Sequence, residues 1–324
     1  MIGTFICKAL IWCMAGAIGL SFILIFQKDV FQIECPYHLQ QVAPQLSVRN
    51  YLRFSNRQNT LKSFCLNEKN ATTMSNLTAK KMVVNDRYKM LICLIPKAAT
   101  TTWKRMFLMF DGVPQENVTE LTKPAVHRQK FKYLFRYKES RWEHIKQNYH
   151  SFIFVRHPFE RLLSTYRNKF LDPYNNIFRE KYIPLIQQQL KKKANASRMS
   201  KAKKEISFAD FLSFVISRPH ENEHWNPFQN LCSPCSMKYD YIGKMETLVE
   251  DSEEIMRRVG VGDKFSFLEN STDKYQKKTS DLMRKYYVPL KSELVQQVYT
   301  TYRDDFRAFG YEIPKYLRRK IRDI

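Results

Sequence analysis

Glycine is scarce in this chain of 324 residues, which contains 8, and none lies in the segment CLIPKAATTTWKRM, from Cys93 to Met106. In that segment an apolar run ends in Pro-Lys and is followed by small and hydroxyl-bearing residues, as in a phosphate-binding loop. A Walker A loop requires Gly-x-x-x-x-Gly-Lys-Ser/Thr, with its lysine after the glycines and a hydroxyl for magnesium. Because Lys97 precedes the loop and glycine is absent, the segment argues against a metal-dependent kinase or ATPase.

Acidic residues are also few, with 31 Asp and Glu against 54 Lys and Arg, for a net charge of +23. Such an excess predicts a polyanionic partner, either nucleic acid, an anionic membrane or an acidic polysaccharide, unless the surface is merely basic. The segment 187–204 carries Lys191 to Lys193 and Lys201 to Lys204 and has almost no large apolar residue. We interpret it either as a solvated, mobile insertion or as a basic flap over an acidic polymer.

The chain has one uncharged apolar run long enough to span a membrane, Ala9 to Phe26. The run exceeds the usual apolar region of a signal peptide, and no clear Ala-x-Ala site follows it, which favours an uncleaved anchor over a cleaved signal. We predict a cytoplasmic tail over 1–8, a transmembrane signal-anchor over 9–26, and a lumenal remainder. Within it, the polar and broken segment 27–85 is predicted to be a stem, ordered in part near Cys65, and 86–324 the catalytic domain.

Five Asn-x-Ser/Thr sequons follow the apolar run and support a lumenal location, since such sites are glycosylated in secreted proteins. Their clustering outside the apolar runs fits exposed loops. The predicted acceptor residues are Asn70, Asn76, Asn117, Asn195 and Asn270.

Five of the seven cysteines follow the apolar run, and this odd number leaves at least one free or paired between chains. No second cysteine pair at zinc-finger spacing accompanies Cys232-Ser-Pro-Cys235, and a lumenal location favours structural disulfides over zinc or redox chemistry. Cys93 lies in an apolar, strand-like run, so we expect a buried free thiol there. The sequence does not determine which cysteines pair.

The chain repeats one local pattern, in which a short apolar strand is followed by a loop and a helix. Residues 88–95 form the first predicted strand, before the helical TTTWKRMFLMF, and 151–155 the second, before a helix with Pro158 in its first turn. A third strand is predicted at 239–246, ahead of the helical TLVEDSEEIMRRVGV. Strands alternating with helices predict a P-loop-like α/β domain with a central, mainly parallel sheet flanked by helices.

Two of these units are predicted to bind anions. The first directs backbone N–H groups and a positive helix end at one point, where Lys97 and the hydroxyls of Thr100 to Thr102 can reach a phosphate or phosphosulfate. In the second, Arg156 ends a strand and Ser164 lies about two turns into the next helix, a set that can hold a terminal phosphate. Alternatively, Arg156 pairs with Glu160 or Asp172. Two anion sites on parallel strands fit one nucleotide with phosphates at both ends.

The motifs PKAATTTWKR and FVRHPFERLLSTYRNKF resemble the 5′-phosphosulfate and 3′-phosphate segments of sulfotransferases. The second motif resembles in particular a segment of the Golgi carbohydrate sulfotransferases. Two further segments resemble the same family, EHWNPFQNLCSPCSMKYDYIGKMETL and YTTYRDDFRAFGYEIP. That family includes the chondroitin and dermatan 4-O-sulfotransferases, the GalNAc-4-sulfotransferases and the HNK-1 sulfotransferase. The resemblance extends from about Met90 to Pro314. One departure is His157, which stands where the family commonly has an acidic residue.

The resemblance implies transfer of a sulfuryl group from 3′-phosphoadenosine 5′-phosphosulfate to a sugar hydroxyl, without a metal. By position, Lys97 stabilises charge on the leaving phosphate oxygen. Arg156 and Ser164 bind the 3′-phosphate through their side chains, and the residues between them mainly frame the loop and the helix start. The implied cofactor-binding residues are Pro96, Lys97, Ala98, Ala99, Thr100, Thr101, Thr102, Arg156, His157, Pro158, Phe159, Glu160, Arg161, Leu162, Leu163 and Ser164.

Transfer to a hydroxyl also requires a base, either a histidine or a carboxylate within hydrogen-bond reach. Sulfotransferases often place it between the two cofactor motifs, where this chain has His127, His144 and His150. We favour His127, after a short extended segment, over His144 in the helical RWEHIKQNY. His224 in EHWNPF and Glu246 in KMET are expected to contact substrate.

The sequence therefore predicts a type II Golgi membrane enzyme that acts on an anionic glycan, with the 4-O position of GalNAc in chondroitin or dermatan as the leading acceptor. Alternatives are glucuronic acid of the HNK-1 type, terminal GalNAc of glycoproteins, or an inactive lumenal glycan-binding relative. The presence of Lys97 and Arg156 argues against an inactive relative, and the anchor and sequons argue against nucleic acid. Because threonines stand where glycine is usual, we expect ordinary backbone conformations in the loop.

Overall fold

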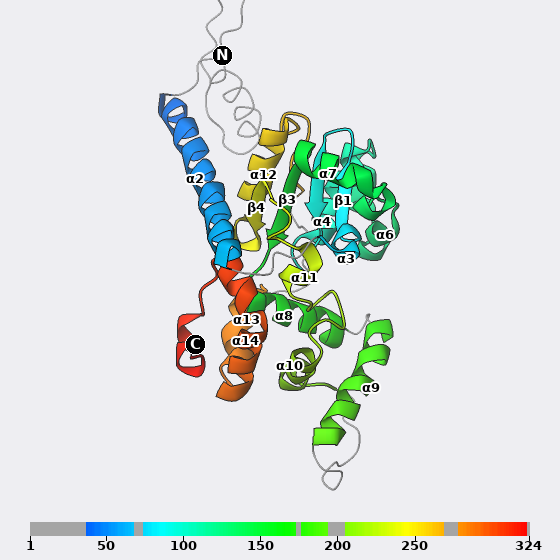
Figure 1. The fold of residues 1–324 in the computed structure, drawn as a ribbon, viewed down its shortest axis with the longest axis vertical. Helices are drawn as coiled ribbons and strands as arrows, with labels where there is room; N and C mark the ends of the chain where they lie inside the picture. Colours follow the sequence, from blue (N-terminus) through cyan, green and yellow to red (C-terminus); the bar gives the residue numbers. More distant parts are fainter. Residues whose placement is uncertain (1–36, 68–73, 173–175, 194–204, 269–277, 323–324) are drawn as a thin grey trace, which may run out of the picture.

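The computed structural model describes residues 37–67, 74–172, 176–193, 205–268 and 278–322 (Figure 1). The predicted tail and signal-anchor lie outside the described residues. Among the described helices, none is both long and apolar enough to cross a membrane.

A four-stranded sheet forms the centre of one lobe. Its strands are β1 (Met82–Asn85), β2 (Met90–Cys93), β3 (His150–Val155) and β4 (Tyr241–Lys244), in that spatial order. β1 is antiparallel to β2, whereas β2, β3 and β4 run parallel, so the sheet is mixed and mainly parallel, as predicted. Because parallel strands end at the same edge, the segments that follow β2, β3 and β4 meet there.

Helix α4 (Thr100–Phe110) packs against the middle of the sheet through the indole ring of Trp103. Trp103 is fully buried, and its ring lies 4.6 Å from that of Phe152 and 5.4 Å from that of Phe154 on β3. The other helices of this lobe are α3 (Asn76–Ala79), α5 (Gln115–Glu120), α6 (Lys123–Arg128), α7 (Glu139–Asn148), α11 (Phe228–Cys232) and α12 (Leu248–Val259), with 3-10 turns η1 (Leu134–Arg136) and η3 (Met245–Thr247).

The second lobe is helical and has its own aromatic-rich core. Helix α8 (Pro158–Tyr166) leads into it from the end of β3, and α10 (Phe208–Ser217) and α14 (Ser292–Ala308) pack against each other below the sheet lobe in Figure 1. Its elements are α8 (Pro158–Tyr166), a π-helical turn η2 (Arg167–Leu171), α9 (Asn176–Lys193), α10 (Phe208–Ser217), α13 (Thr279–Tyr287), α14 (Ser292–Ala308) and a 3-10 turn η4 (Lys315–Lys320).

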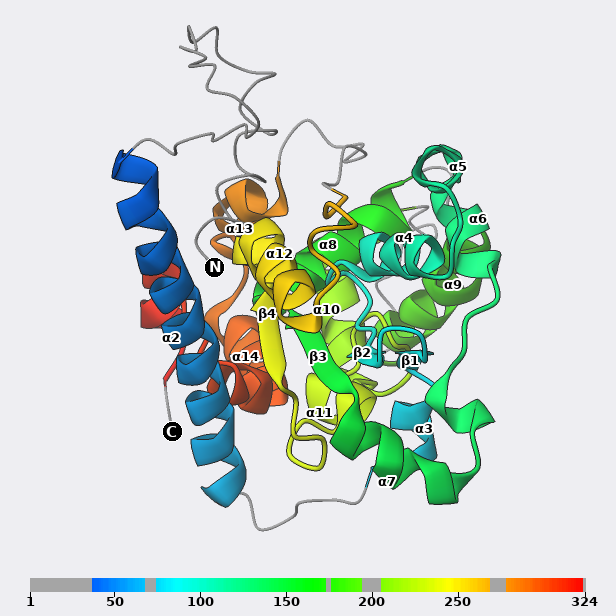
Figure 2. The ribbon, with the colours of Figure 1, turned by 90° about the horizontal axis from the view of Figure 1, so that it is seen from above.

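A long helix, α2 (Tyr37–Asn67), runs beside the edge strand β4 (Figure 2). Arg57 Nη1 donates to the carbonyl of Ile242 at 2.8 Å, and Gln58 Nε2 donates to that of Asp240 at 2.7 Å. These side chains bond carbonyls at and just before the edge strand. The segment predicted as a stem therefore contains a helix packed on the sheet, although its sequence shows little helical periodicity.

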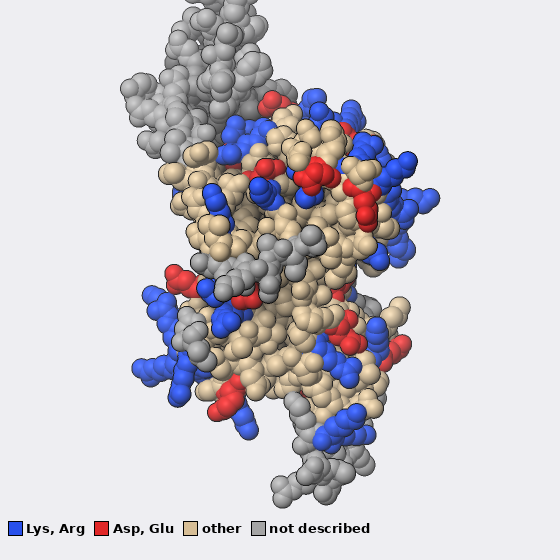
Figure 3. Space-filling model, viewed as in Figure 1, with Lys and Arg blue, Asp and Glu red and all other residues tan. Residues whose placement is uncertain are grey.

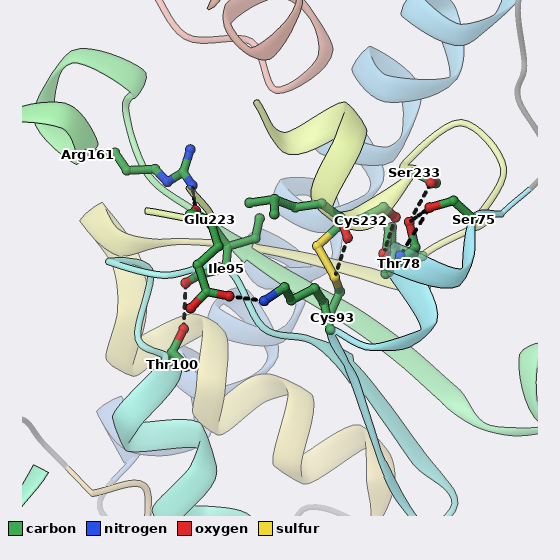
Figure 4. Close-up of a disulfide and its surroundings, with 12 residues drawn as sticks. Ser75, Thr78, Cys93, Ile95, Thr100, Arg161, Glu223, Cys232 and Ser233 are labelled. Carbon is green, nitrogen blue, oxygen red and sulfur yellow. Dashed lines mark hydrogen bonds and ion pairs between the residues drawn. A yellow bond between two sulfur atoms is a disulfide. The ribbon is translucent and has the colours of Figure 1, made fainter. Parts of the chain in front are cut away.

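Two disulfides join distant parts of the sheet lobe. Cys65, near the end of α2, bonds Cys235. Cys93, the last residue of β2, bonds Cys232, and Figure 4 shows this second disulfide. Structural disulfides at Cys232 and Cys235 are thus confirmed, but the prediction of a free thiol at Cys93 is wrong. Cys232 comes to β2 from 139 residues away, a tertiary contact that local sequence cannot reveal.

We predict that Asp251→Ala strongly destabilises the fold. The Asp251 side chain is fully buried, 2.6 Å from Arg57 and 3.2 Å from Arg53 on α2. Removing the carboxylate leaves both guanidinium groups without their counter-ion, which costs about 3–5 kcal/mol for a buried pair. Urea unfolding followed by far-UV circular dichroism measures the loss.

The matched control is Glu221→Ala, which removes a more exposed carboxylate 3.6 Å from Arg218. An exposed pair contributes about 0–1 kcal/mol, so this variant should unfold close to wild type. Equal free energies of unfolding for the two variants would show that α2 is not held by Asp251.

Candidate functional site

The loop between β2 and α4 contains two non-glycine residues in left-handed conformation, Lys97 with φ 72° and Ala99 with φ 58°. Such a conformation costs a non-glycine residue about 1–2 kcal/mol. Thr100 to Thr102 are helical, so the expectation of ordinary backbone geometry holds for the threonines and is wrong for Lys97 and Ala99. The turn is held in part by Thr100 Oγ1 and Ala98 N–H, which both donate to the carbonyl of Ile95, at 2.5 and 3.1 Å.

The start of α4 has the features of an anion site. Its N-cap residue is Ala99, which has no side-chain acceptor for the amides of the first turn. These N–H groups and the positive end of the helix point toward the loop, where a left-handed residue next to helical ones further concentrates N–H donors. Lys97 is half-buried in the same loop. The chemistry of this donor set fits a phosphosulfate.

Arg156, directly after β3, contacts both predicted phosphate segments. Its Nη1 donates to the carbonyl of Lys97 at 3.2 Å, and its Nη2 lies 2.6 Å from Glu160 Oε1. The alternative pairing with Glu160 therefore occurs in the structure. Within the described part of the chain the buried Nε has no hydrogen-bond partner, so one donor stays available. Ser164 lies two turns along α8 and is 8% exposed.

Arg161 lies behind the loop and is 1% exposed (Figure 4). Its three guanidinium nitrogens donate to the carbonyls of Pro96 at 3.2 Å, Glu223 at 2.8 Å and Asn226 at 2.9 Å. The group also lies 4.8 Å from the ring of Phe228, and burial lowers the pKa of Arg161 to about 10. All its nitrogens bond backbone, so Arg161 shapes the loop rather than facing a ligand.

The remaining residues of the second motif are packing residues. Phe159, Leu162 and Leu163 are fully buried in the helical core. His157 Nε2 lies 3.1 Å from the carbonyl of Glu312, to which it donates, and burial lowers the pKa of this histidine. These contacts join the motif to the C-terminal segment.

The structure brings His127 to the loop. His127 lies in helix α6, not after an extended segment as the sequence suggested, and its Nε2 is 3.0 Å from Thr101 Oγ1. Its Nδ1 is 3.4 Å from Lys104 Nζ. An ammonium group can only donate, so Nδ1 accepts and Nε2 carries the hydrogen. Desolvation of the ring, with the charges of Lys104, Lys169 and Arg105, lowers the pKa of His127 to about 4.

The other two histidines of this interval are not brought to the loop. His144 is exposed on α7 and lies 3.3 Å from Asn148, and His150 is the first residue of β3. The phosphate segments follow the last residue of β3, and six residues of strand span roughly 20 Å. His144 and His150 therefore lie toward the opposite edge of the sheet.

Both predicted substrate contacts lie on the loop side of the sheet. His224 adjoins Glu223, whose carbonyl Arg161 binds, and Lys97 is one of the cations near its ring. Glu246 follows β4 and accepts a hydrogen bond from Tyr311 at 3.3 Å.

Three lysines that lie around the site were not identified from the sequence, namely Lys81, Lys104 and Lys169. Desolvation by burial lowers the pKa of each, to about 8 for Lys104, where the charge of Lys81 adds to the effect. Lys104 and Lys169 lie within the motifs TWKR and RNKF, which was the available signal. The described residues contain no group of three side chains suited to a metal ion.

Two of the predicted glycosylation sites are described, and both are exposed. Asn76 begins α3, and Asn117 lies in α5. Asn70, Asn195 and Asn270 lie outside the described residues, as do Lys201 to Lys204.

Comparisons with known proteins identify relatives across most of the chain. Residues 80–312 match the sulfotransferase family. The chain is 33% identical to carbohydrate sulfotransferase 11 of Rattus norvegicus, over 74% of this chain and 69% of that protein. It is 32% identical to carbohydrate sulfotransferase 14 of Danio rerio, over 72% and 62%, and 28% identical to carbohydrate sulfotransferase 12 of Mus musculus, over 81% and 69%. No solved structure matches the chain.

We predict that Arg161→Lys weakens binding of 3′-phosphoadenosine 5′-phosphate at least tenfold. Lysine cannot donate to three carbonyls in the planar geometry of a guanidinium, so the Pro96 carbonyl loses its donor and the loop relaxes. A hydrogen bond to a charged group contributes about 1.5–3 kcal/mol. Isothermal titration calorimetry measures the affinity, with Arg284→Lys, an exposed site on α13, as control. Equal affinity in both variants would contradict the role of Arg161.

Proposed function

The chain belongs to the sulfotransferase family, and we propose that it transfers a sulfuryl group from 3′-phosphoadenosine 5′-phosphosulfate to a hydroxyl of an anionic glycan. The observation that most directly supports the proposal is that hydrogen bonds connect the two predicted phosphate-binding segments of the chain. Arg156 and Arg161, after β3, donate to two successive carbonyls of the loop after β2, those of Lys97 and Pro96. One nucleotide with phosphates at both ends fits such a pair of joined anion sites.

The proposed chemistry requires stabilisation of negative charge at the leaving phosphate oxygen. The acceptor oxygen attacks sulfur, and the bond between sulfur and the phosphate oxygen breaks. In our proposal the Lys97 ammonium and the first-turn amides of α4 bind that oxygen as its charge develops. The amides are fixed before reaction by the conformation of the loop and helix start, so they need little reorganisation.

His127 is proposed to act at the sulfuryl group, because Thr101 joins it to the loop at 3.0 Å. The sequence predicts it as the base. In the present arrangement its Nε2–H donates to Thr101 Oγ1, and we propose that the same N–H donates to a sulfuryl oxygen when the donor is bound. Accepting a proton at Nε2 would require the other tautomer.

For the acceptor we propose the 4-O position of GalNAc in chondroitin or dermatan. Relatives named carbohydrate sulfotransferases support a sugar acceptor, and the charge of the chain supports a polyanion. Glucuronic acid and terminal GalNAc of glycoproteins are the competing acceptors. We further propose a Golgi location with the apolar run 9–26 as a type II anchor, consistent with the sequons.

A strip of exposed cations extends from His127 along the surface and suits a polyanionic chain. Figure 3 shows Lys and Arg gathered at the margin of the sheet lobe near α6 and α7. Between residues 123 and 141 the sequence has one acidic residue, Glu139. The exposed cations of this basic strip are Lys123, Arg128, Lys130, Lys132, Arg136, Lys138 and Arg141.

We predict that the purified protein transfers radiolabelled sulfate from the donor to desulfated chondroitin or dermatan, and that Lys97→Ala lowers kcat about 10²–10³-fold, the usual effect of removing one such charge-stabilising group. Disaccharide analysis of the product identifies the sulfated position. Label at the 4-O position of GalNAc supports the proposed acceptor.

A panel that includes desulfated heparan, glucuronic acid-terminated and GalNAc-terminated glycans separates the competing acceptors. Transfer only to one of the latter two would overturn the acceptor and keep the reaction. Transfer to none, with Lys97→Ala equal to wild type, would overturn the reaction itself.

We predict that the double variant Arg128→Glu/Lys130→Glu lowers kcat/KM for the glycan on the order of tenfold at low salt, because it replaces two cations of the basic strip beside His127 with anions. The difference in kcat/KM from wild type should shrink as the salt concentration rises, since screening weakens the electrostatic interaction of either protein with the glycan. Initial rates at several ionic strengths measure this. Lys285→Glu/Lys291→Glu changes the net charge equally at exposed sites of the helical lobe. If kcat/KM for the glycan decreases as much in this control, the basic strip has no specific role.

A further inference from the structure

His224 is held in one tautomer by its neighbours. Its Nδ1 lies 2.8 Å from Asn222 Oδ1, which also accepts the backbone N–H of His224 at 2.9 Å. A backbone N–H can only donate, so the end of the Asn222 amide that faces it is the oxygen, and the amide nitrogen donates to Tyr182 OH at 2.9 Å. Because Oδ1 can only accept, Nδ1 carries the hydrogen and Nε2 has the lone pair. Among the described residues, Nε2 has no hydrogen-bond partner.

Two further contacts fix His224 beside the phosphate segments. Thr165, which follows Ser164 on α8, donates to the carbonyl of His224 at 3.0 Å. Arg161 binds the carbonyls of Glu223 and Asn226 on either side of it, and the carbonyl of Pro96 in the loop. The backbone at residue 224 is therefore tied to both halves of the donor site.

The two histidines of the site are set in opposite tautomers. At His127 the lone pair faces Lys104 and the N–H faces the loop, whereas at His224 the N–H faces Asn222 and the lone pair is available. A general base needs an available lone pair, and an electrophilic donor needs an N–H. The site thus contains one histidine suited to each task.

The surroundings of His224 keep it neutral. Desolvation, followed by the charges of Lys169, Lys97, Arg161 and Lys81, lowers its pKa well below the usual 6.5. Glu223, the nearest carboxylate in sequence, is paired with Lys81, and the ring of Phe178 on α9 lies 5.7 Å away. The ring is therefore unprotonated, with a lone pair on Nε2, at neutral and mildly acidic pH.

We propose that His224, oriented by Asn222, is the general base that removes the proton of the acceptor hydroxyl. The inference rests on the proposed sulfuryl transfer. The hydroxyl proton moves to Nε2 as the acceptor oxygen bonds to sulfur, and the bond between sulfur and the phosphate oxygen breaks. 3′-Phosphoadenosine 5′-phosphate leaves with that electron pair, and the imidazolium later releases its proton to water. His127 donates its Nε2–H to a sulfuryl oxygen in place of Thr101 Oγ1.

The first test is His224→Asn, whose amide N–H can replace Nδ1–H as a donor to Asn222 but offers no basic nitrogen. We expect kcat to decrease about 10²–10⁴-fold, the usual contribution of a general base. Binding of 3′-phosphoadenosine 5′-phosphate, measured by calorimetry, should stay within twofold of wild type. Turnover near wild type with intact binding would overturn the proposal.

The second test uses the pH dependence of kcat/KM, which reports the pKa of the free enzyme's essential base. For wild type the acid limb should lie below pH 6.5. In Asn222→Asp a carboxylate accepts the Nδ1–H, and an adjacent negative charge raises a histidine pKa by about 1–3 units. We therefore expect the acid limb to move up by about one pH unit or more.

Lys104→Gln is the matched variant for His127, since Lys104 lowers the pKa of His127 and is not among the groups that shift His224. Its acid limb should coincide with wild type. If the acid limb moves relative to wild type in Lys104→Gln and is unchanged in Asn222→Asp, then His127 is the base and the proposal is overturned. A wrong assignment of the base can be told apart from a wrong assignment of the reaction. If the protein does not catalyse sulfuryl transfer, wild type shows no turnover on any glycan.

Discussion

The arrangement of the site depends on the buried guanidinium of Arg161. A cation that is 1% exposed is stable in the fold only if its donors are satisfied, and here three backbone carbonyls do so. Those carbonyls belong to the loop after β2 and to the segment before α11, while Arg161 itself belongs to α8. The stacked ring of Phe228 and Asp305, which accepts the Phe228 N–H at 2.9 Å, extend the network to α14. One side chain thus fixes the relative position of three chain segments.

This network explains how a loop without glycine adopts left-handed geometry. Lys97 and Ala99 are strained positions, and such residues persist where the surroundings over-determine them. Here the carbonyls of Pro96 and Lys97 accept from two arginines, and Cys93 at the end of β2 is disulfide-bonded to Cys232. The strain is held by tertiary contacts, and the small residues leave the backbone N–H groups accessible to an anion.

Much of this was readable from sequence, because the strand-loop-helix pattern and the order of Lys97, Arg156 and Ser164 are local. The mainly parallel sheet and the family followed from those patterns. The left-handed loop residues, the pairing of Cys93 and the helix packed on β4 were not predictable, since each depends on contacts from distant segments. Likewise, the choice among histidines depends on tautomers, which Asn222 and Lys104 determine through side-chain contacts that the motifs do not reveal.

The central claim is that the loop after β2 and the segment after β3 form one site for a two-ended nucleotide. The most direct measurement is a crystal structure of the protein with bound 3′-phosphoadenosine 5′-phosphate. We expect the 5′-phosphate at the first-turn amides of α4 and at Lys97, and the 3′-phosphate at Arg156 and Ser164. A nucleotide bound in the reverse direction, or away from either segment, would contradict the account.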